Sequence, residues 1–137
     1  MGMDVWAIDI PSHKDTEWLS PNGAKGYFRD CYNNYSLANW LTRNIDPEAR
    51  GDWGLRIFDK EQEGFNTRKW REELYKTVKK WLNKAENLRD KVTYAGYPDS
   101  KPIKLSPEKT NDFIDWLKEL VSFAELVVTT NSRVDVW

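Results

Sequence analysis

The chain has 137 residues, 39% of them hydrophobic and 31% charged, and its formal net charge at pH 7 is −1. That length is typical of one domain, spanning residues 1–137, and the 14% share of aromatic residues excludes an intrinsically disordered chain. The single cysteine excludes an internal disulfide, and the lack of a leader-like start or of an apolar run that could cross a bilayer predicts a cytoplasmic protein with no membrane partner.

The first predicted element is a strand. Residues 4–10, with the sequence DVWAIDI, alternate between two faces, and Pro11 ends the run. Residues 12–26 are polar and contain a Pro-Asn-Gly turn, so we expect a loop there. Ser36 can cap a short helix over 37–44, because its hydroxyl can accept a hydrogen bond from the first helical turn.

The centre of the chain carries the clearest helical pattern. Residues 53–58 predict a short strand that begins at a tight bend. In residues 66–91 the apolar side chains fall in one arc of a helical wheel, opposite a row of lysines and arginines. We therefore expect a long amphipathic helix with one buried face and one basic, solvated face.

An ordered loop and a further helix are expected next. Residues 94–105 contain a glycine and two prolines, which favour a loop. Ser106 then caps a helix that has Pro107 at its first position, and its apolar stripe predicts an end near Val121.

The end of the chain predicts a hairpin. Residues 126–130 are apolar and β-branched, and residues 134–137 alternate after a turn. Asp-Val-Trp occurs at 4–6 and again at 135–137, so we expect the two terminal strands to pair in one sheet, with Trp137 buried there. The predicted fold class is α+β: a small mixed sheet of about four strands, including both termini, packed against two or three helices.

The chain offers few groups for catalysis. Acid–base or nucleophilic chemistry usually needs a histidine, cysteine or serine oriented by a carboxylate, and the one histidine and one cysteine are His13 and Cys31. A lone cysteine is more often a small buried apolar residue. Metal-ligand spacings are absent, and the pair Asp112 and Asp115 falls on a solvated helix face. The sequence therefore favours binding over catalysis and predicts no catalytic residue, cofactor or metal centre.

The segment 26–41, GYFRDCYNNYSLANWL, is the best candidate for binding. Tyrosine and tryptophan offer large contact areas at low entropic cost, arginine can pair or stack, and asparagine hydrogen-bonds without charge. Alternatively, Phe28, Tyr32, Tyr35 and Trp40 fill the core while the asparagines cap turns, and one segment can also pack one side and present the other. With the turn at 52–53 included, the candidate partner-binding residues are Tyr27, Arg29, Tyr32, Asn33, Asn34, Tyr35, Asp52 and Trp53.

Four motifs follow one another along the chain: MGMDVW at 1–6, Tyr27-Phe28-Arg29 followed by Asn33, Asn34 and Trp40, the turn at 51–55, and the helix at 106–117. In this order they resemble a set of small phage and prophage proteins. Those proteins begin with MGMDV, carry YFRNN before a tryptophan-rich patch, and end with a helix of the form SxExxxxFxxFL. The resemblance implies a viral origin rather than a particular chemistry, and here Asp30-Cys31-Tyr32 interrupts the Arg-Asn-Asn run.

Three binding functions follow from these observations. The first is a phage-encoded accessory protein that inhibits a host defence protein by stoichiometric binding. The second is a nucleotide sponge, in which a tyrosine or tryptophan ring stacks on a base while Arg29 and one or two lysines hold its phosphates. The third is nucleic-acid binding through the 66–91 helix, where Lys69, Lys76 and Lys80 are the candidate anion-binding residues and acidic residues share the same face. Assembly into a homo-oligomer stays open.

Overall fold

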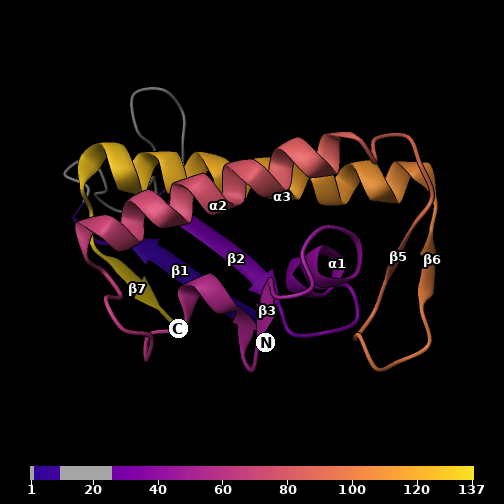
Figure 1. The fold of residues 1–137 in the computed structure, drawn as a ribbon, viewed down its shortest axis with the longest axis horizontal. Helices are drawn as coiled ribbons and strands as arrows, with labels where there is room; N and C mark the ends of the chain where they lie inside the picture. The colour runs from indigo at the N-terminus through magenta and orange to yellow at the C-terminus, as the bar shows by residue number, and fades with distance from the viewer. Residues whose placement is uncertain (1, 10–25) are drawn as a thin grey trace.

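The computed structural model describes residues 2–9 and 26–137, and it confirms an α+β fold in which a sheet holding both terminal strands packs against helices (Figure 1). None of the helices in these two ranges is both long and apolar enough to cross a bilayer. The elements are β1 (Gly2–Ala7), β2 (Tyr27–Cys31), α1 (Leu37–Asn44), β3 (Arg50–Gly51), β4 (Gly54–Leu55), the 3-10 turn η1 (Arg56–Phe58), α2 (Arg68–Glu86), β5 (Thr93–Ala95), β6 (Ile103–Leu105), α3 (Pro107–Thr130) and β7 (Val134–Val136).

The main sheet has three strands in the order β2-β1-β7. It therefore has one strand fewer than the expected four. Both pairings are antiparallel, so this sheet is not mixed. Val5 lies opposite Phe28 on one side and Val136 on the other, which confirms that the terminal strands pair. Alternate residues of β1, Met3, Val5 and Ala7, are buried, as the period of two requires.

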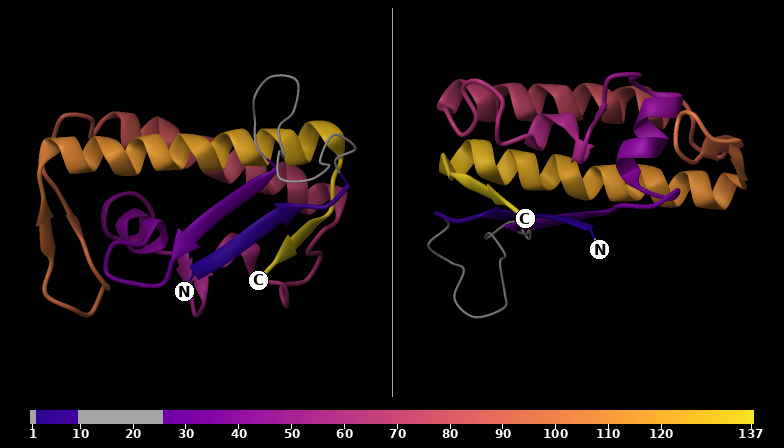
Figure 2. Two further views of the ribbon diagram at one scale, coloured as in Figure 1. Left: turned by 180° about the vertical axis from the view of Figure 1, so that it is seen from behind. Right: turned by 90° about the horizontal axis from the view of Figure 1, so that it is seen from below.

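Two long helices cover one side of the main sheet. Figures 1 and 2 show α2 and α3 side by side, running in opposite directions, and in the right-hand view of Figure 2 α3 lies between α2 and the sheet. Thr67 caps α2 and Ser106 caps α3, each accepting a hydrogen bond from a backbone N–H of the first turn. Pro107 lies in the first turn of α3, as the sequence predicted. The short helix α1 begins after Ser36, whose Oγ accepts from the Asn39 N–H at 3.0 Å.

The core contains indole rings whose N–H groups all find acceptors. Trp40 stacks on Phe113 with 5.4 Å between ring centroids, and its Nε1 donates to Thr93 Oγ1 at 3.0 Å. Trp70 donates to the Ile57 carbonyl and Trp81 to Asp46, both at 3.0 Å. A buried indole therefore loses no hydrogen bond on folding at these positions.

The predicted C-terminal hairpin is wrong, because α3 continues well past Val121 to Thr130. Leu126 and Val127 are buried and extend the apolar stripe of the helix. Packing has overridden the β-propensity of branched side chains. The helix ends at Asn131, which takes a left-handed conformation with φ +52°.

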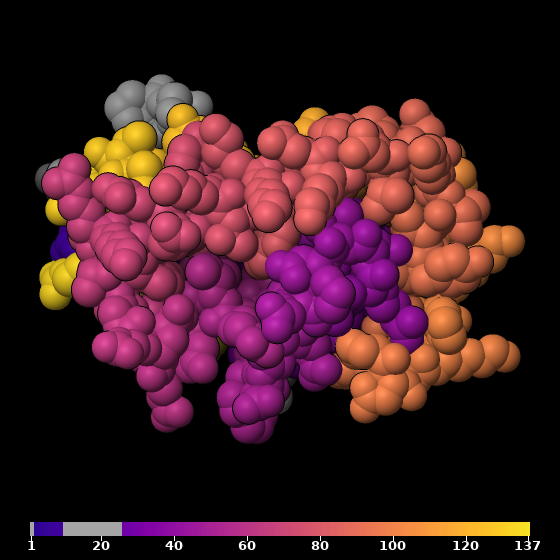
Figure 3. Space-filling model, in the orientation of Figure 1, coloured from indigo at the N-terminus to yellow at the C-terminus, as the bar shows by residue number. Residues whose placement is uncertain are grey.

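Three shorter segments also differ from expectation. Residues 53–58 supply only the two-residue strand β4 before η1, and the loop expected at 94–105 is the hairpin β5–β6. Trp137 is 75% exposed rather than buried. The loop expected at 12–26 falls outside the described residues except for its last position. Figure 3 shows the β3–β4 and β5–β6 hairpins projecting at the same edge of the molecule.

Asp30 shapes the connection between β2 and α1. Its side chain is fully buried and accepts hydrogen bonds from the backbone N–H groups of Cys31 at 2.8 Å, Leu37 at 2.8 Å and Ala38 at 3.0 Å. Two of these donors belong to the first turn of α1, so the carboxylate acts as a second cap beside Ser36. Burial raises the pKa of Asp30 to about 6, although the three N–H groups act in the opposite direction.

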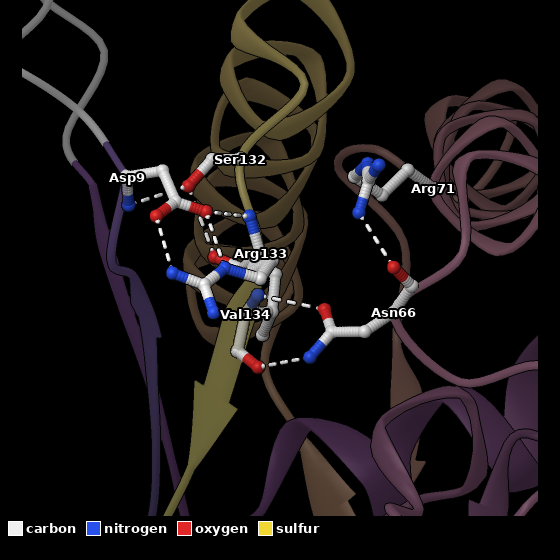
Figure 4. Close-up of polar contacts among 6 residues, drawn as sticks. All are labelled: Asp9, Asn66, Arg71, Ser132, Arg133 and Val134. Atoms are coloured by element: carbon white, nitrogen blue, oxygen red, sulfur yellow. Dashed lines mark hydrogen bonds and ion pairs between the residues drawn. The ribbon is translucent and has the colours of Figure 1, made fainter.

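A polar clamp holds β7 against the start of α2 (Figure 4). Asn66, with φ +66°, accepts from the Val134 N–H and donates to the Val134 carbonyl, both at 2.7 Å, in the way a neighbouring strand would. The buried Arg71 donates to the Asn66 carbonyl at 2.7 Å and to the Asn131 side chain. Asp9 accepts from the Arg133 guanidinium and backbone, and this pairing lowers the pKa of the carboxyl to about 2.

The clamp predicts a specific loss of stability. We expect Asn66→Gly to lower the free energy of unfolding by about 2 kcal/mol, because glycine keeps the positive φ but loses both hydrogen bonds to Val134. Asn66→Asp keeps the acceptor and loses only the donor, so its free energy of unfolding should lie between those of the wild type and Asn66→Gly. Urea denaturation measures all three proteins, and a glycine variant as stable as the wild type would refute this role.

Asp30 predicts a pH dependence of stability. The folded protein holds the Asp30 proton up to about pH 6, whereas the unfolded chain releases it near the ordinary carboxyl pKa of 3.8. Between pH 3.8 and about pH 6 the folded state therefore binds more protons than the unfolded state. The free energy of unfolding should fall by about 3 kcal/mol as the pH rises through this range. Asp30→Asn cannot ionise, so denaturant titrations at several pH values should show the fall in the wild type only. Parallel curves for the two proteins would contradict the assignment.

Candidate functional site

The structure divides the predicted site residues into two groups. Tyr27 and Arg29 lie on β2 and form a cluster with Asp4 of β1: the Tyr27 hydroxyl donates to the carboxylate, and Arg29 donates to the same oxygen at 3.1 Å. The Trp6 ring lies 4.2 Å from the Tyr27 ring, measured between centroids. Burial and the Asp4 contact raise the pKa of Tyr27. These side chains are occupied with one another, and neither Tyr27 nor Arg29 lines the grooves described below.

The turn between β2 and α1 presents rings outward. Tyr32 is 40% exposed and Tyr35 50% exposed, whereas Phe28 and Trp40 are buried in the core. The asparagines build the turn: Asn33 Oδ1 accepts from the Tyr35 N–H at 2.8 Å, and the Asn34 carbonyl accepts from the Gly96 N–H at 2.9 Å. The segment thus packs one side and presents the other, and its asparagines serve mainly to hold the backbone.

The β3–β4 hairpin places two further predicted residues at an exposed tip. Asp52 and Trp53 form the turn, and Trp53 is 84% exposed. Gly54 follows with φ +113°, and a Cβ there would lie 3.3 Å from the Tyr32 ring. Only glycine combines this backbone conformation with so close an approach. The hairpin is therefore held directly against Tyr32.

A large groove of about 460 Å³ lies on one side of this hairpin. Its walls carry the exposed rings of Tyr32, Trp53 and Trp137. Its rim is charged, and Lys60 there also lies 3.9 Å from Asp135. Buried apolar side chains form the rest of the lining: Met3, Leu55, Phe58 and Val136. The charged rim residues are Asp52, Arg56, Asp59, Lys60 and Glu61.

A small groove of about 280 Å³ lies beside it and shares Tyr32, Asp52, Trp53 and Gly54 as lining. Tyr97 closes it from the β5–β6 side, where the Arg50 guanidinium lies 5.0 Å from the Tyr97 ring centroid. The rest of the small groove is lined by Cys31, Asn33, Ser36, Ala38 and Asn39. Figure 3 shows the projecting hairpin with a hollow on either side.

The far wall of the small groove is rigid because Arg43 holds the β5–β6 turn. Its guanidinium donates to the carbonyls of Gly96 at 2.8 Å and Ser100 at 2.7 Å, and also to that of Tyr97. The Tyr97 hydroxyl in turn donates to the Tyr32 carbonyl at 3.3 Å. A wall held from both sides loses little freedom when a partner docks.

The thiol in the small groove is poorly suited to nucleophilic attack. Cys31 Sγ donates to Asn33 Oδ1 at 3.3 Å. Burial, together with the nearby Asp30 charge, raises the pKa of the thiol, so it stays protonated at neutral pH. Its sequence-suggested partner His13 lies outside the described residues.

The basic helix presents a mixed surface. Lys69, Lys76 and Lys80 are exposed on α2, as the helical pattern predicted. Lys76 lies 4.0 Å from Glu73, and the neighbouring Arg68 lies 3.4 Å from Glu72. These carboxylates lower the local positive potential that phosphate binding would use.

Sequence reasoning missed several lining residues of the two grooves. Trp137 was expected in the core, and Arg50 and Tyr97 were not singled out. A signal existed for Tyr97, because it lies between Gly96 and Pro98 in an expected loop, and binding residues are found disproportionately on loops. The pairing of Arg50 with Tyr97 has no local signal, since it joins separate hairpins.

Comparison with known proteins does not assign a family or a function to these grooves. No family model matches the chain, and neither a curated protein nor a solved structure matches it. The candidate site therefore rests on its own residues: two adjoining grooves around an exposed tryptophan hairpin.

Proposed function

We propose that this protein acts by stoichiometric binding of a protein partner through the two grooves and the hairpin between them. The observation that carries the proposal is the exposure of two indole rings, Trp53 at 84% and Trp137 at 75%. Tryptophan is among the residues most enriched at binding hot spots. Exposing two of them around apolar grooves costs solubility, which a partner that covers them would offset.

The geometry suits recognition without chemistry. The Trp53 ring stands on a hairpin whose backbone at Gly54 lies close against Tyr32, so little backbone entropy is lost on contact. Apolar floors with polar rims are the usual anatomy of protein interfaces.

The identity proposed for the partner comes from the resemblance. A phage-encoded accessory protein that inhibits a host defence protein would act in the host cytoplasm and need only to occupy its target. The aromatic grooves supply the contact surface for such occupation.

A capture experiment tests this proposal. We expect the purified protein to retain a host protein from lysate in a fixed molar ratio, and Tyr32→Ala with Trp53→Ala to weaken that binding by roughly thirtyfold or more. Tyr94→Ala, which removes an exposed tyrosine that lines neither groove, is the matched control and should bind as the wild type does. Retention of no partner, or equal retention by the groove variant, would count against the proposal.

The large groove also favours a second candidate, the nucleotide sponge. Its volume of about 460 Å³ lies in the range of small-molecule sites, and its lining includes the bases Arg56 and Lys60 as well as Trp53 and Trp137. Asp59 and Glu61 on the same rim oppose a phosphate, which is why protein binding is the first proposal.

Thermal shift against a nucleotide panel separates the two candidates. A nucleotide at about 100 times its Kd would stabilise the folded state by about 2.7 kcal/mol and raise Tm by several degrees. Trp137→Ala should abolish that rise while Tyr94→Ala leaves it in place. A flat panel at saturating concentrations removes the sponge and leaves protein binding as the remaining candidate.

A further inference from the structure

We infer that the small groove receives a tryptophan side chain of the partner, whose indole N–H donates to Asn39 Oδ1. This inference rests on the proposed function and specifies the chemistry of the contact. It arises from one polar atom that the fold leaves without a hydrogen bond.

Asn39 lies among the lining residues of the small groove, and its other polar groups are occupied. Its Nδ2 donates to the Asn33 carbonyl and its backbone N–H to Ser36 Oγ, both at 3.0 Å. Within the described part of the chain, Asn39 Oδ1 is buried and accepts no hydrogen bond. Native proteins leave few buried acceptors in this state, so the atom marks a place where a donor is missing.

The surroundings of this acceptor select a flat ring. Tyr32, Trp53 and Tyr97 contribute aromatic surfaces to the groove. Arg50, which also lines the groove, lies over the Tyr97 ring with its guanidinium carbon 5.0 Å from the ring centroid, and a guanidinium stacks readily on flat aromatic rings. A volume of about 280 Å³ suits one inserted side chain rather than a drug-sized molecule.

The indole fits this combination better than the other planar groups. It offers a single N–H donor and no acceptor, which matches one unpaired acceptor among apolar and aromatic walls. A phenylalanine ring has no donor, and a guanidinium carries five N–H donors for this one unpaired acceptor. A nucleobase carries several donors and acceptors along its edge, most of which would stay unpaired here.

Entry requires movement at the mouth of the groove, because Asn39 Oδ1 is closed to solvent in the free protein. Tyr32 and Trp53 are the wall residues that can turn aside. Both rings are exposed, and among the described residues neither side chain makes a hydrogen bond.

The test uses N-acetyl-tryptophanamide as the probe, titrated into isotope-labelled protein and followed by NMR. We expect shifts at the Asn39 side-chain amide and at Arg50 and Tyr97. N-acetyl-1-methyl-tryptophanamide has the same ring without the N–H donor, and it should bind roughly tenfold more weakly, the equivalent of about 1.4 kcal/mol. No shifts with the first probe, or equal affinity for both probes, would overturn the inference.

A variant gives a second measurement. Asn39→Leu removes the acceptor and keeps the size of the side chain, so the preference between the two probes should vanish; an unchanged preference would argue against Asn39 as the acceptor. If the variant does not fold, the two-probe comparison on the wild-type protein still decides. A wild-type protein that captures its partner from lysate but ignores the probe retains the proposed function and loses this inference. A protein that binds the probe in the small groove but captures no partner keeps the inferred indole site and loses the proposed function.

Discussion

The buried carboxylate of Asp30 is the contact on which the candidate site depends. It accepts three backbone N–H groups, from Cys31 at the end of β2 and from Leu37 and Ala38 at the start of α1. Fixing both ends of the connection leaves only the turn between them free to face solvent, and Tyr32 is placed there against the β3–β4 hairpin. No cation lies within salt-bridge distance of this carboxylate in the described residues, so its stabilisation comes from oriented peptide dipoles.

Five of the indole rings in the described part of the chain form two classes that differ in hydrogen bonding as well as in exposure. Trp40, Trp70 and Trp81 are buried and donate to acceptors within the chain. Trp53 and Trp137 expose most of their surface, and within residues 2–9 and 26–137 neither ring donates a hydrogen bond. The buried rings stabilise the fold, whereas the two exposed rings beside the apolar grooves are the ones available to the binding that we propose.

Local signals in the sequence were sufficient for part of the fold and insufficient for the site. The caps at Ser36 and Ser106 and the pairing of the terminal strands followed from short-range patterns, and the structure confirms them. The C-terminal half of α3 was mistaken for a strand because β-branched residues were weighed without the helix on which they pack. Tyr32 and Trp53 were singled out by residue type, but their meeting in one groove depends on tertiary contacts. The position of Tyr97 depends on Arg43, which lies in a different element, and no period or spacing encodes that contact.

The side chain of Asn66 occupies both backbone groups of Val134 on the outer edge of β7, and at the opposite edge the Trp116 indole donates to the Arg29 carbonyl at 3.1 Å. Open strand edges are where chains template aggregation by adding further strands. The one-to-one binding that we propose requires the protein to accumulate to at least the concentration of its target. Because these two side chains occupy backbone groups on both flanks of the sheet, they oppose the addition of further strands, and with it the growth of fibrils, at such a concentration.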